Sequence, residues 1–320
     1  MKLVRMALTA IGFAVGLAST ASAQTVGIAT TPAGSFTNST GAAIAKVIAD
    51  HTRVRAVVQA SAGHALQGID QGAIELGINN YFDVLLFVKG IEDYAGTGEK
   101  KNTRVVASIL PLYVGILVRN DSGIKSIADL KGKRIGGGFG AQILIDRWWR
   151  TILATSGLSY SDVVSVPAQN VVMAADDYRA GKTDAFLFAL GSAKVKEVAV
   201  SVGGLRLLPI EASEQAIKAA DKIMPGSYAF TVQPSPGLEE VRGPTPVIAS
   251  DLIMFGNAKV SDEVIYAVVK AMHVNKKDLV AIFPPLQLFE PGNIAKPQPG
   301  LEYHPGAIKY YKEAGVWPKP

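Results

Sequence analysis

Short apolar runs rich in β-branched residues alternate with segments of helical periodicity along most of the chain. Residues 25–29, 54–58 and 74–78 have the composition of buried strands, and Ile44 and Ile48 recur at helical spacing between the first two. Strands that alternate with helices predict a mostly parallel sheet with helices on its faces. The pattern therefore indicates an α/β fold.

The strand–loop–helix units of the first part of the chain have counterparts further along. The segment Gly72-x-x-Glu-Leu-Gly-Ile-Asn79 resembles Gly181-x-x-Asp-Ala-Phe-Leu-Phe188, and other strand ends recur at nearly the same separation. Two series of strand–loop–helix units that are offset by a nearly constant number of residues predict two lobes of similar topology. We expect lobe one to comprise residues 24–112 plus 247–320, and lobe two with its return segment to comprise residues 113–246.

Two apolar segments and one helix fall outside these series. Residues 105–118 are predicted to form two strands broken near Pro111, because proline interrupts a strand ladder. Residues 246–255 are predicted to form a further strand. Ser261 is expected to cap a helix that runs through Ile282.

The first residues have the three parts of a secretory signal peptide. Lys2 and Arg5 form a basic start, residues 7–18 an apolar run, and residues 21–23 the small-x-small cleavage site Ala-Ser-Ala. The apolar run is shorter than the roughly 20 residues that span a bilayer. We therefore expect cleavage after Ala23 and, since no cysteine follows that could carry a lipid, a periplasmic protein.

Composition limits the classes of partner. The chain has no cysteine, 48% hydrophobic residues and a net charge of +5. Loss of Lys2 and Arg5 with the signal peptide lowers that charge to +3. Such a weak, dispersed charge does not predict nucleic-acid binding. A mature chain of this length usually folds as two domains, and we expect it to be a monomer.

Six polar loops follow the predicted strands. In open α/β sheets ligands bind outside the carboxyl ends of the strands, so these loops are the candidate site. Their glycines permit close approach of the backbone, and helix starts attract a carboxylate or phosphate. Ordinary turn and cap residues explain any one such loop equally well, but six at equivalent strand ends favour a site. The candidate ligand-binding residues in these loops are Ser35, Phe36, Thr37, Gln59, Ser61, Ala62, Gly63, His64, Asn79, Asn80, Tyr81, Gly138, Gly140, Gln142, Phe188 and Gly191.

Signals for catalysis are weak. The chain has no His-Glu-x-x-His, Gly-x-Ser-x-Gly or phosphate-binding loop motif, and its histidines lack metal-ligand spacing. Neighbouring Trp148 and Trp149 cannot share a helix face, so one of them is expected in the core. We predict no enzyme activity, cofactor or metal site. Two alternatives stay open: an exported enzyme that uses Asp83 and His64 as an acid–base pair, and an extracytoplasmic sensor or interaction module.

Several stretches resemble the TAXI family, the solute receptors of TRAP transporters. The most specific is residues 117–135, a form also found in other binding proteins of the type II periplasmic fold. Residues 30–36, 58–63, 226–228 and 303–317 are similar to the family as well. The resemblance covers nearly the whole chain after the predicted signal peptide.

The resemblance implies two α/β lobes, each a mostly parallel sheet flanked by helices, that close on a ligand. It implies TRAP membrane subunits as partners and a small organic ligand, namely a dicarboxylate, oxo acid or amino acid. It carries binding to many of the loop residues named above and adds Tyr228. The chain departs from the family pattern at Pro32, Phe36, His64 and Phe139. We therefore expect a pocket less polar than is usual in that family.

Overall fold

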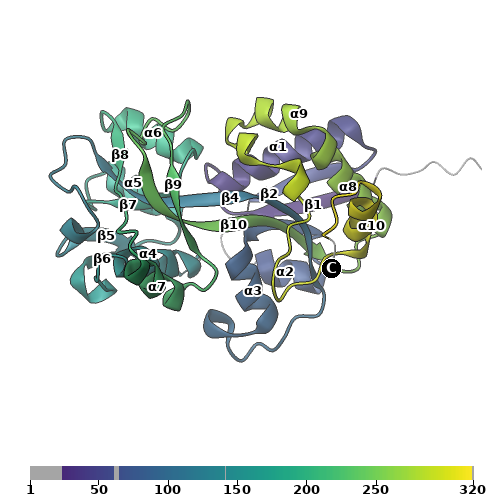
Figure 1. The fold of residues 1–320 in the computed structure, drawn as a ribbon, viewed down its shortest axis with the longest axis horizontal. Helices are drawn as coiled ribbons and strands as arrows, with labels where there is room; N and C mark the ends of the chain where they lie inside the picture. The colour runs from purple at the N-terminus through teal and green to yellow at the C-terminus, as the bar shows by residue number, and fades with distance from the viewer. Residues whose placement is uncertain (1–23, 61–64, 141, 319–320) are drawn as a thin grey trace, which may run out of the picture.

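A computed structural model describes residues 24–60, 65–140 and 142–318 of the chain (Figure 1). The predicted signal peptide and the candidate residues Ser61, Ala62, Gly63 and His64 lie outside the described residues. The ribbon separates into two groups of elements that are linked by two long strands (Figure 1). We call them lobe one and lobe two, following the predicted division of the chain.

Lobe one is built on three parallel strands in the order β2-β1-β3. Its helices cover the sheet, and the last three helices of the chain return to this lobe (Figure 1). The elements are β1 (Thr25–Thr30), α1 (Phe36–His51), β2 (Arg55–Ala60), α2 (Ala65–Gln71), β3 (Leu76–Asn80), α3 (Tyr81–Lys89), α8 (Asp262–Val274), α9 (Lys276–Ile282) and α10 (Pro305–Glu313).

Lobe two repeats this arrangement. Strand β5 pairs in parallel with β6 on one side, and a parallel bridge from Ile135 to Ala185 places β7 on the other. The elements are β5 (Arg134–Gly137), α4 (Leu144–Ala154), β6 (Val164–Pro167), α5 (Val171–Arg179), β7 (Phe186–Ala189), α6 (Ala193–Ser201), β8 (Leu205–Leu207), α7 (Glu214–Ile223) and β9 (Tyr228–Val232).

Two long strands, β4 (Thr103–Arg119) and β10 (Thr245–Asn257), connect the lobes and pair with each other antiparallel. Strand β10 runs antiparallel beside β3, and β4 runs antiparallel beside β7. One eight-stranded mixed sheet therefore spans both lobes in the order β2-β1-β3-β10-β4-β7, with β8 beside β4 and β9 beside β10, while β5 and β6 form a separate pair next to β7. The strands follow the order β2-β1-β3-β10 in lobe one and β6-β5-β7-β4 in lobe two. The two lobes share one topology, as the repeated sequence pattern predicts.

The predicted break at Pro111 is wrong, because β4 is continuous through this residue. Strand β7 pairs with β4 only from Val114 onward. At Pro111 one edge of β4 is therefore free of β7, and a residue without an N–H group is tolerated there. The single helix predicted from Ser261 to Ile282 is also wrong.

That helix is two helices, α8 and α9, separated at Asn275. The backbone of Asn275 has φ −116° and ψ 39°, outside the helical range. Its side-chain Nδ2 donates a 2.8 Å hydrogen bond to the carbonyl of Ala271. Asparagine side chains compete in this way for the backbone groups that would extend a helix, which accounts for the interruption.

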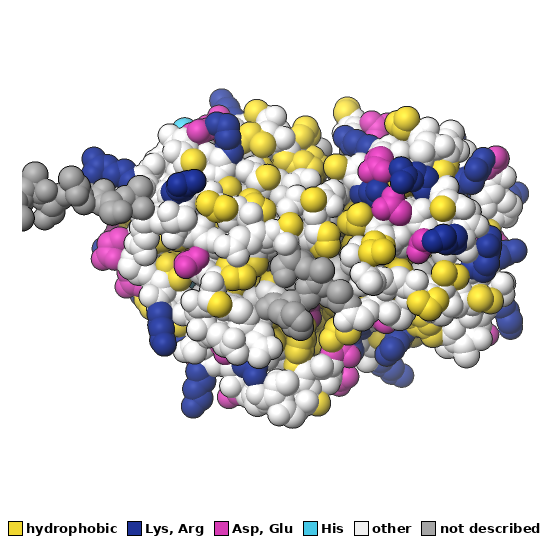
Figure 2. Space-filling model, turned by 180° about the vertical axis from the view of Figure 1, so that it is seen from behind, with side chains coloured by type: hydrophobic (Ala, Val, Ile, Leu, Met, Phe, Trp, Pro, Cys, Tyr) yellow, Lys and Arg dark blue, Asp and Glu magenta, His cyan; other side chains and the backbone are white. Residues whose placement is uncertain are grey.

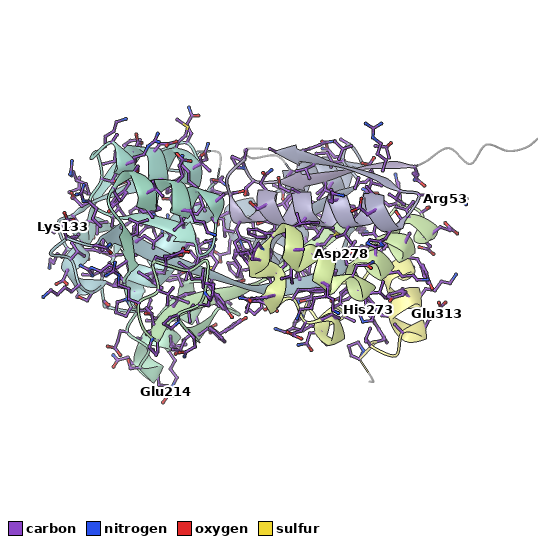
Figure 3. The ribbon with its side chains drawn as sticks, turned by 90° about the horizontal axis from the view of Figure 1, so that it is seen from above. Arg53, Lys133, Glu214, His273, Asp278 and Glu313 are labelled. Carbon is purple, nitrogen blue, oxygen red and sulfur yellow. The ribbon has the colours of Figure 1, made fainter. Side chains whose placement is uncertain are left out.

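Large apolar side chains fill the interior of both lobes. Trp148 and Trp149 are each 1% exposed, and the apolar cores on the two sides of the sheet meet along β4 and β10. In the part of the chain that the structure describes, no helix is both long and apolar enough to cross a membrane. Charged residues such as Lys133 and Arg53 lie toward opposite outer ends of the molecule (Figure 3).

Candidate functional site

A cavity of about 730 Å³ lies between the lobes. Lobe one contributes the end of β1, the start of α1, the end of β3 and the start of α3, whereas lobe two contributes α4, the end of β7 and the loops before α4 and α5. The crossing strand β4 adds Leu112 and Val114. From behind, uncharged and hydrophobic side chains predominate along the junction, and most charges lie on the flanks (Figure 2). The carboxyl ends of the strands thus meet across one cavity, as expected for an α/β sheet.

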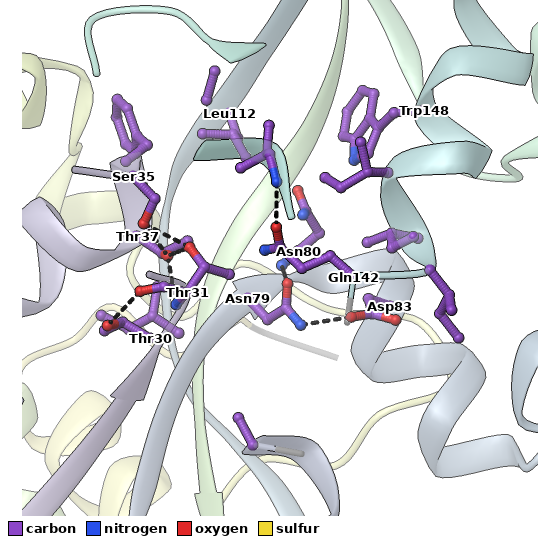
Figure 4. A pocket seen from close by; sticks show the side chains of 18 of the residues that line it. Thr30, Thr31, Ser35, Thr37, Asn79, Asn80, Asp83, Leu112, Gln142 and Trp148 are labelled. Atoms are coloured by element: carbon purple, nitrogen blue, oxygen red, sulfur yellow. Dashed lines mark hydrogen bonds between the residues drawn. The ribbon is translucent and has the colours of Figure 1, made fainter. Parts of the chain in front are cut away.

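A cluster of hydroxyl groups surrounds the start of α1 (Figure 4). Ser35 caps the helix and accepts a hydrogen bond from the backbone N–H of Asn38. The Thr31 hydroxyl donates to Ser35 Oγ at 2.6 Å and also contacts the Thr37 hydroxyl, while Thr37 Oγ1 accepts from the Thr31 N–H at 3.1 Å. The helix start and the fixed hydroxyls together suit a ligand oxygen that accepts hydrogen bonds.

A second polar cluster lies where β3 passes into α3. Asp83, in the first turn of α3, is 7% exposed. Its Oδ2 accepts a 2.6 Å hydrogen bond from Asn79 Nδ2, and its Oδ1 accepts a 2.7 Å bond from the Tyr94 hydroxyl (Figure 4). Asn79 Oδ1 in turn accepts from the backbone N–H of Asn80 at 2.8 Å. The carboxylate is therefore held in one orientation at the cavity wall.

Burial and, to a lesser extent, the nearby charge of Asp93 raise the pKa of Asp83, and its net value is about 6. The hydrogen bonds from Tyr94 and Asn79 and the charge of Arg147 lower the pKa of Asp83 in part. Burial and the neighbouring Asp83 charge raise the pKa of Tyr94 well above its usual range. At neutral pH Asp83 is mainly ionised, so the cavity wall carries a buried negative charge.

Asn80 brings an unused acceptor to the same wall. Its side chain is 8% exposed and lines the cavity. Although Asn80 is the N-cap residue of α3, its side chain makes no capping hydrogen bond. Its Oδ1 is buried and has no hydrogen-bond partner among the described residues. Buried polar atoms are normally paired, so this oxygen is suited to a ligand donor.

Lobe two gives the cavity a mainly apolar wall. Trp148 lines it, and Figure 4 shows the indole nitrogen on the side of the ring that faces the cavity. Leu187 and Phe188 at the end of β7 add apolar surface. Gln142 also lines the cavity, where its Oε1 accepts a 2.8 Å hydrogen bond from the N–H of Val171. An apolar lining with a few fixed polar groups is typical of small-molecule sites.

The model of the NMT1-like family matches residues 28–315. The chain belongs to the NMT1-like family. Among solved structures, one titled as a periplasmic transporter matches with a TM-score of 0.59 at 14% identity and covers 93% of this chain and 94% of its own. A protein of Bordetella bronchiseptica RB50 matches with a TM-score of 0.51 at 15% identity and covers 91% of this chain and 98% of its own. This NMT1-like protein therefore has the two-lobed α/β fold of the type II periplasmic binding proteins.

Many of the predicted site residues of this NMT1-like protein meet at the cavity, and others lie apart from it. Those that line it are Ser35, Phe36, Thr37, Asn79, Asn80, Gly140, Gln142 and Phe188. Five described residues are not among its lining residues: Gln59, Tyr81, Gly138, Gly191 and Tyr228. Lining a cavity is not binding, so these assignments stay predictions.

The five other residues have partners elsewhere in the NMT1-like fold. The Tyr81 hydroxyl donates to the carbonyl of Pro299 at 2.6 Å, and the Tyr228 hydroxyl donates to Asp251 at 3.1 Å. The remaining three, Gln59, Gly138 and Gly191, lie near Gly27, Asp146 and Glu240 respectively. These contacts give each residue a place in the fold that does not involve the cavity.

The predicted site of this NMT1-like protein did not include Thr31, Tyr94 or Trp148, and Asp83 was considered only as one member of an acid–base pair with His64. Thr31 lies in a loop that the pattern did identify. Tyr94, in the short 3₁₀ segment Glu92–Tyr94, had no signal because only the tertiary fold brings it to Asp83. For the adjacent Trp148 and Trp149 the sequence predicted that one lies in the core, whereas the structure buries both and places Trp148 beside the cavity.

Among the described residues, hydrogen bonds from Arg147 and from Lys194 join the lobes. Arg147 of α4 donates to Asp93 Oδ2 at 2.8 and 3.0 Å, and to the carbonyl of Ile223 at 2.9 Å. It also lies 3.4 Å from Glu92. Elsewhere the N–H of Lys194 donates to the Gly34 carbonyl at 3.2 Å. These contacts hold the lobes together around the cavity.

The described histidines lie away from the cavity lining. His51 contacts Asp278 at 2.7 Å, His273 contacts the Tyr310 hydroxyl at 2.7 Å, and His304 caps α10. Within the described ranges, no group of three His, Asp or Glu side chains is arranged to hold a metal ion. An acid–base pair of Asp83 and His64 involves a residue outside those ranges, so it stays a hypothesis.

Proposed function

We propose that this NMT1-like protein is a solute receptor that captures a small organic molecule between its lobes and releases it to the membrane subunits of a TRAP transporter. One observation supports this most strongly: a cavity of about 730 Å³ between two lobes, with a largely apolar lining and fixed polar groups at its lobe-one wall. Cavities of this size and composition are typical of small-molecule sites. The TAXI resemblance supports the choice of transporter.

The hydroxyl cluster at the start of α1 is the proposed site for a carboxylate or another acceptor group of the solute. Ser35 and Thr37 both line the cavity there. An α-helix start carries roughly half a positive charge and can bind an anion without a cationic side chain. This agrees with the described lining, in which no Lys, Arg or His side chain occurs.

We propose that release involves bending of the two crossing strands. The predicted boundaries, between residues 112 and 113 and between 246 and 247, fall on β4 and β10, which link the lobes. Opening would break the contact of Arg147 with Asp93 and expose the cavity. Such hinge closure around a ligand is common in two-lobed receptors.

The receptor is proposed to act as a periplasmic monomer after removal of residues 1–23, and without catalysing a reaction. Both oxygens of Asp83, the ionisable side chain in the described lining that is best placed for acid–base work, already accept hydrogen bonds from Tyr94 and Asn79. These hydrogen bonds fix the orientation of the carboxylate, which suits a binding group. Among the described residues, no specific contact favours an enzyme or a sensor module.

Binding can be tested on protein that has been unfolded and refolded to remove carried-over molecules. Small-molecule extracts of bacteria and a panel of carboxylates are added, and thermal unfolding is followed. A ligand at 100 times its Kd stabilises a protein by about 2.7 kcal/mol, which is easily detected. Mass spectrometry then identifies the bound compound.

The variant Ala189→Phe fills part of the cavity, because Ala189 lines it. This variant should lose the thermal shift. Ala212→Phe adds the same ring at an exposed position and should keep it. If no extract or panel compound stabilises the refolded wild type, and no molecule accompanies the purified protein, the proposed receptor function is wrong.

A further inference from the structure

Asp83 and Asn80 both line the cavity near the start of α3 and bring hydrogen-bond acceptors to it, and the described lining contains no Lys, Arg or His side chain. We call these two residues the acceptor pair. We propose that the solute carries a basic nitrogen that binds to Asp83 and Asn80, so that the protein is a receptor for an organic amine. The inference rests on the proposed receptor function and specifies the chemistry of its ligand.

The hydrogen bonding of Asp83 leaves room for a ligand. A carboxylate offers about four lone-pair sites. Tyr94 and Asn79 each occupy one, on different oxygens. Asn80 Oδ1 has no donor among the described residues although it is buried. An ammonium group, with its three N–H donors, suits the Asp83 carboxylate, and Asn80 Oδ1 can accept from the same group or from another donor of the solute.

The charges around Asp83 also favour a cation. The guanidinium of Arg147 is the positive charge that acts on Asp83, but it is already bonded to Asp93 and to the carbonyl of Ile223. Asp93 pairs with that guanidinium, so the two charges largely offset each other at Asp83. Buried charges in proteins are normally paired, so an ammonium group would supply the missing partner, whereas a carboxylate next to Asp83 would be repelled.

The rest of the cavity defines the body of the amine. Leu112, Val114 and Phe188 line the space beside these polar groups, and Trp148 closes it from lobe two. The body of the solute is therefore apolar. A separate acceptor group on the solute would reach the hydroxyl cluster at the start of α1. The two ends of the solute would then bind to two different polar clusters of lobe one.

The test separates small molecules that carry a basic nitrogen from those that do not. A bacterial small-molecule extract is passed over a strong cation-exchange resin at low pH, which retains compounds with a basic nitrogen and passes carboxylates and neutral compounds. Each fraction is added to refolded wild-type protein at pH 7.5, and thermal unfolding is measured. We expect stabilisation by the retained fraction, followed by recovery of an amine by mass spectrometry.

Two variants assign the effect to the acceptor pair. Asp83→Asn keeps the shape and removes the charge, so affinity for the recovered amine should fall roughly 10- to 100-fold, the range for a charge-assisted hydrogen bond. Asn80→Ala removes the other acceptor without changing charge and should weaken the amine roughly tenfold. Asp50→Asn, at an exposed carboxylate of α1 that pairs with Lys46, is the control and should bind as the wild type does.

The outcomes distinguish this inference from the receptor function. Stabilisation by the unretained fraction alone would overturn the amine and leave the receptor function intact. Stabilisation by neither fraction would overturn both. Equal affinity of the wild type, Asp83→Asn and Asn80→Ala for the recovered amine would show that the acceptor pair does not bind it. Should Asp83→Asn fail to fold, Asn80→Ala still decides the question.

Discussion

The two lobes share one strand order but give the cavity opposite walls. At the end of β3, lobe one presents Asn79 and Asn80, whereas at the end of the equivalent strand β7, lobe two presents Phe188 and Ala189. Lobe one supplies most of the hydrogen-bonding side chains, and lobe two supplies an indole ring and aliphatic side chains. Equivalent positions in a repeated fold can thus have different roles. In the proposed receptor, the polar groups of lobe one select the ligand, and the apolar side chains of lobe two cover it.

The sharpest test of the covering role compares the two tryptophans of lobe two. Trp149→Ala should lower the free energy of unfolding by about 3–5 kcal/mol, the usual cost of removing a buried aromatic ring. Trp148→Ala should cost less, because part of that ring already faces a cavity. Urea unfolding measures both variants. Equal losses of stability would show that Trp148 is packed as fully as Trp149. The two residues would then both belong to the core, and Trp148 would not form a wall of the cavity.

The polar wall of lobe one predicts a dependence of stability on pH. Burial raises the pKa of Asp83 from 3.8 to about 6, so folding favours its protonated form. The resulting stabilisation is complete below pH 3.8 and is lost as pH rises through 6, a change of about 3 kcal/mol. Tyr94 and Asn79 contact this carboxyl group, and Asp93 and Arg147 act on it through their charges. These four residues, together with burial, determine the pKa of Asp83.

The measurement is urea unfolding of the ligand-free wild type and of Asp83→Asn between pH 4 and 8. The stability of the wild type relative to the variant should fall across this range. Asp50→Asn serves as the matched control, and its difference from the wild type should not follow that profile. A flat difference for Asp83→Asn would mean that the polar wall of lobe one is more hydrated than its burial indicates.

The contact between the lobes can be weakened without changing either wall. Arg147→Gln removes the hydrogen bonds to Asp93 and should cost about 1–3 kcal/mol, the range for bonds to charged groups, with the lower end favoured because Glu92 and Asp93 are partly exposed. Small-angle X-ray scattering should show a larger radius of gyration. Arg150→Gln, on the same helix, is the control. An unchanged radius would show that other contacts hold the lobes together.

The smallest expected effect on stability comes from removing a helix cap, and two caps can be compared. Ser35→Ala removes the cap of α1 and should cost about 1 kcal/mol. Ser213→Ala removes the equivalent cap of α7 and should cost a similar amount. Only Ser35 lines the cavity, so only Ser35→Ala should also weaken binding of the recovered solute. Equal affinities of the two variants would exclude the hydroxyl cluster from recognition.

Local sequence signals predicted much of the fold. The strands around Ile28 and Ile78 and the cap at Ser261 follow from periodicity and capping chemistry, and the topology follows from alternation of strands and helices. Continuity at Pro111 and the interruption at Asn275 were missed. The first depends on which neighbour lies beside the strand, and the second on a competing side-chain hydrogen bond.

The candidate site was predicted only where it is formed by loops that directly follow strands. Such loops include Ser35 and Asn80, whose role depends on local chain direction. Tyr94 reaches Asp83 from eleven residues further along the chain, and Trp148 comes from the other lobe. No local pattern encodes these approaches, because they depend on how separate elements pack together.

The pairing of β4 with β10 also limits how the molecule can move. The two strands are joined by a ladder that runs from Thr103 opposite Asn257 to Val114 opposite Ile248. A hydrogen-bonded ribbon of this kind bends more easily out of its plane than within it, and sliding of one strand would require the whole ladder to break. Separation of the lobes should therefore follow mainly one rotational coordinate, so that the distances between several pairs of spectroscopic labels placed across the cavity should change together.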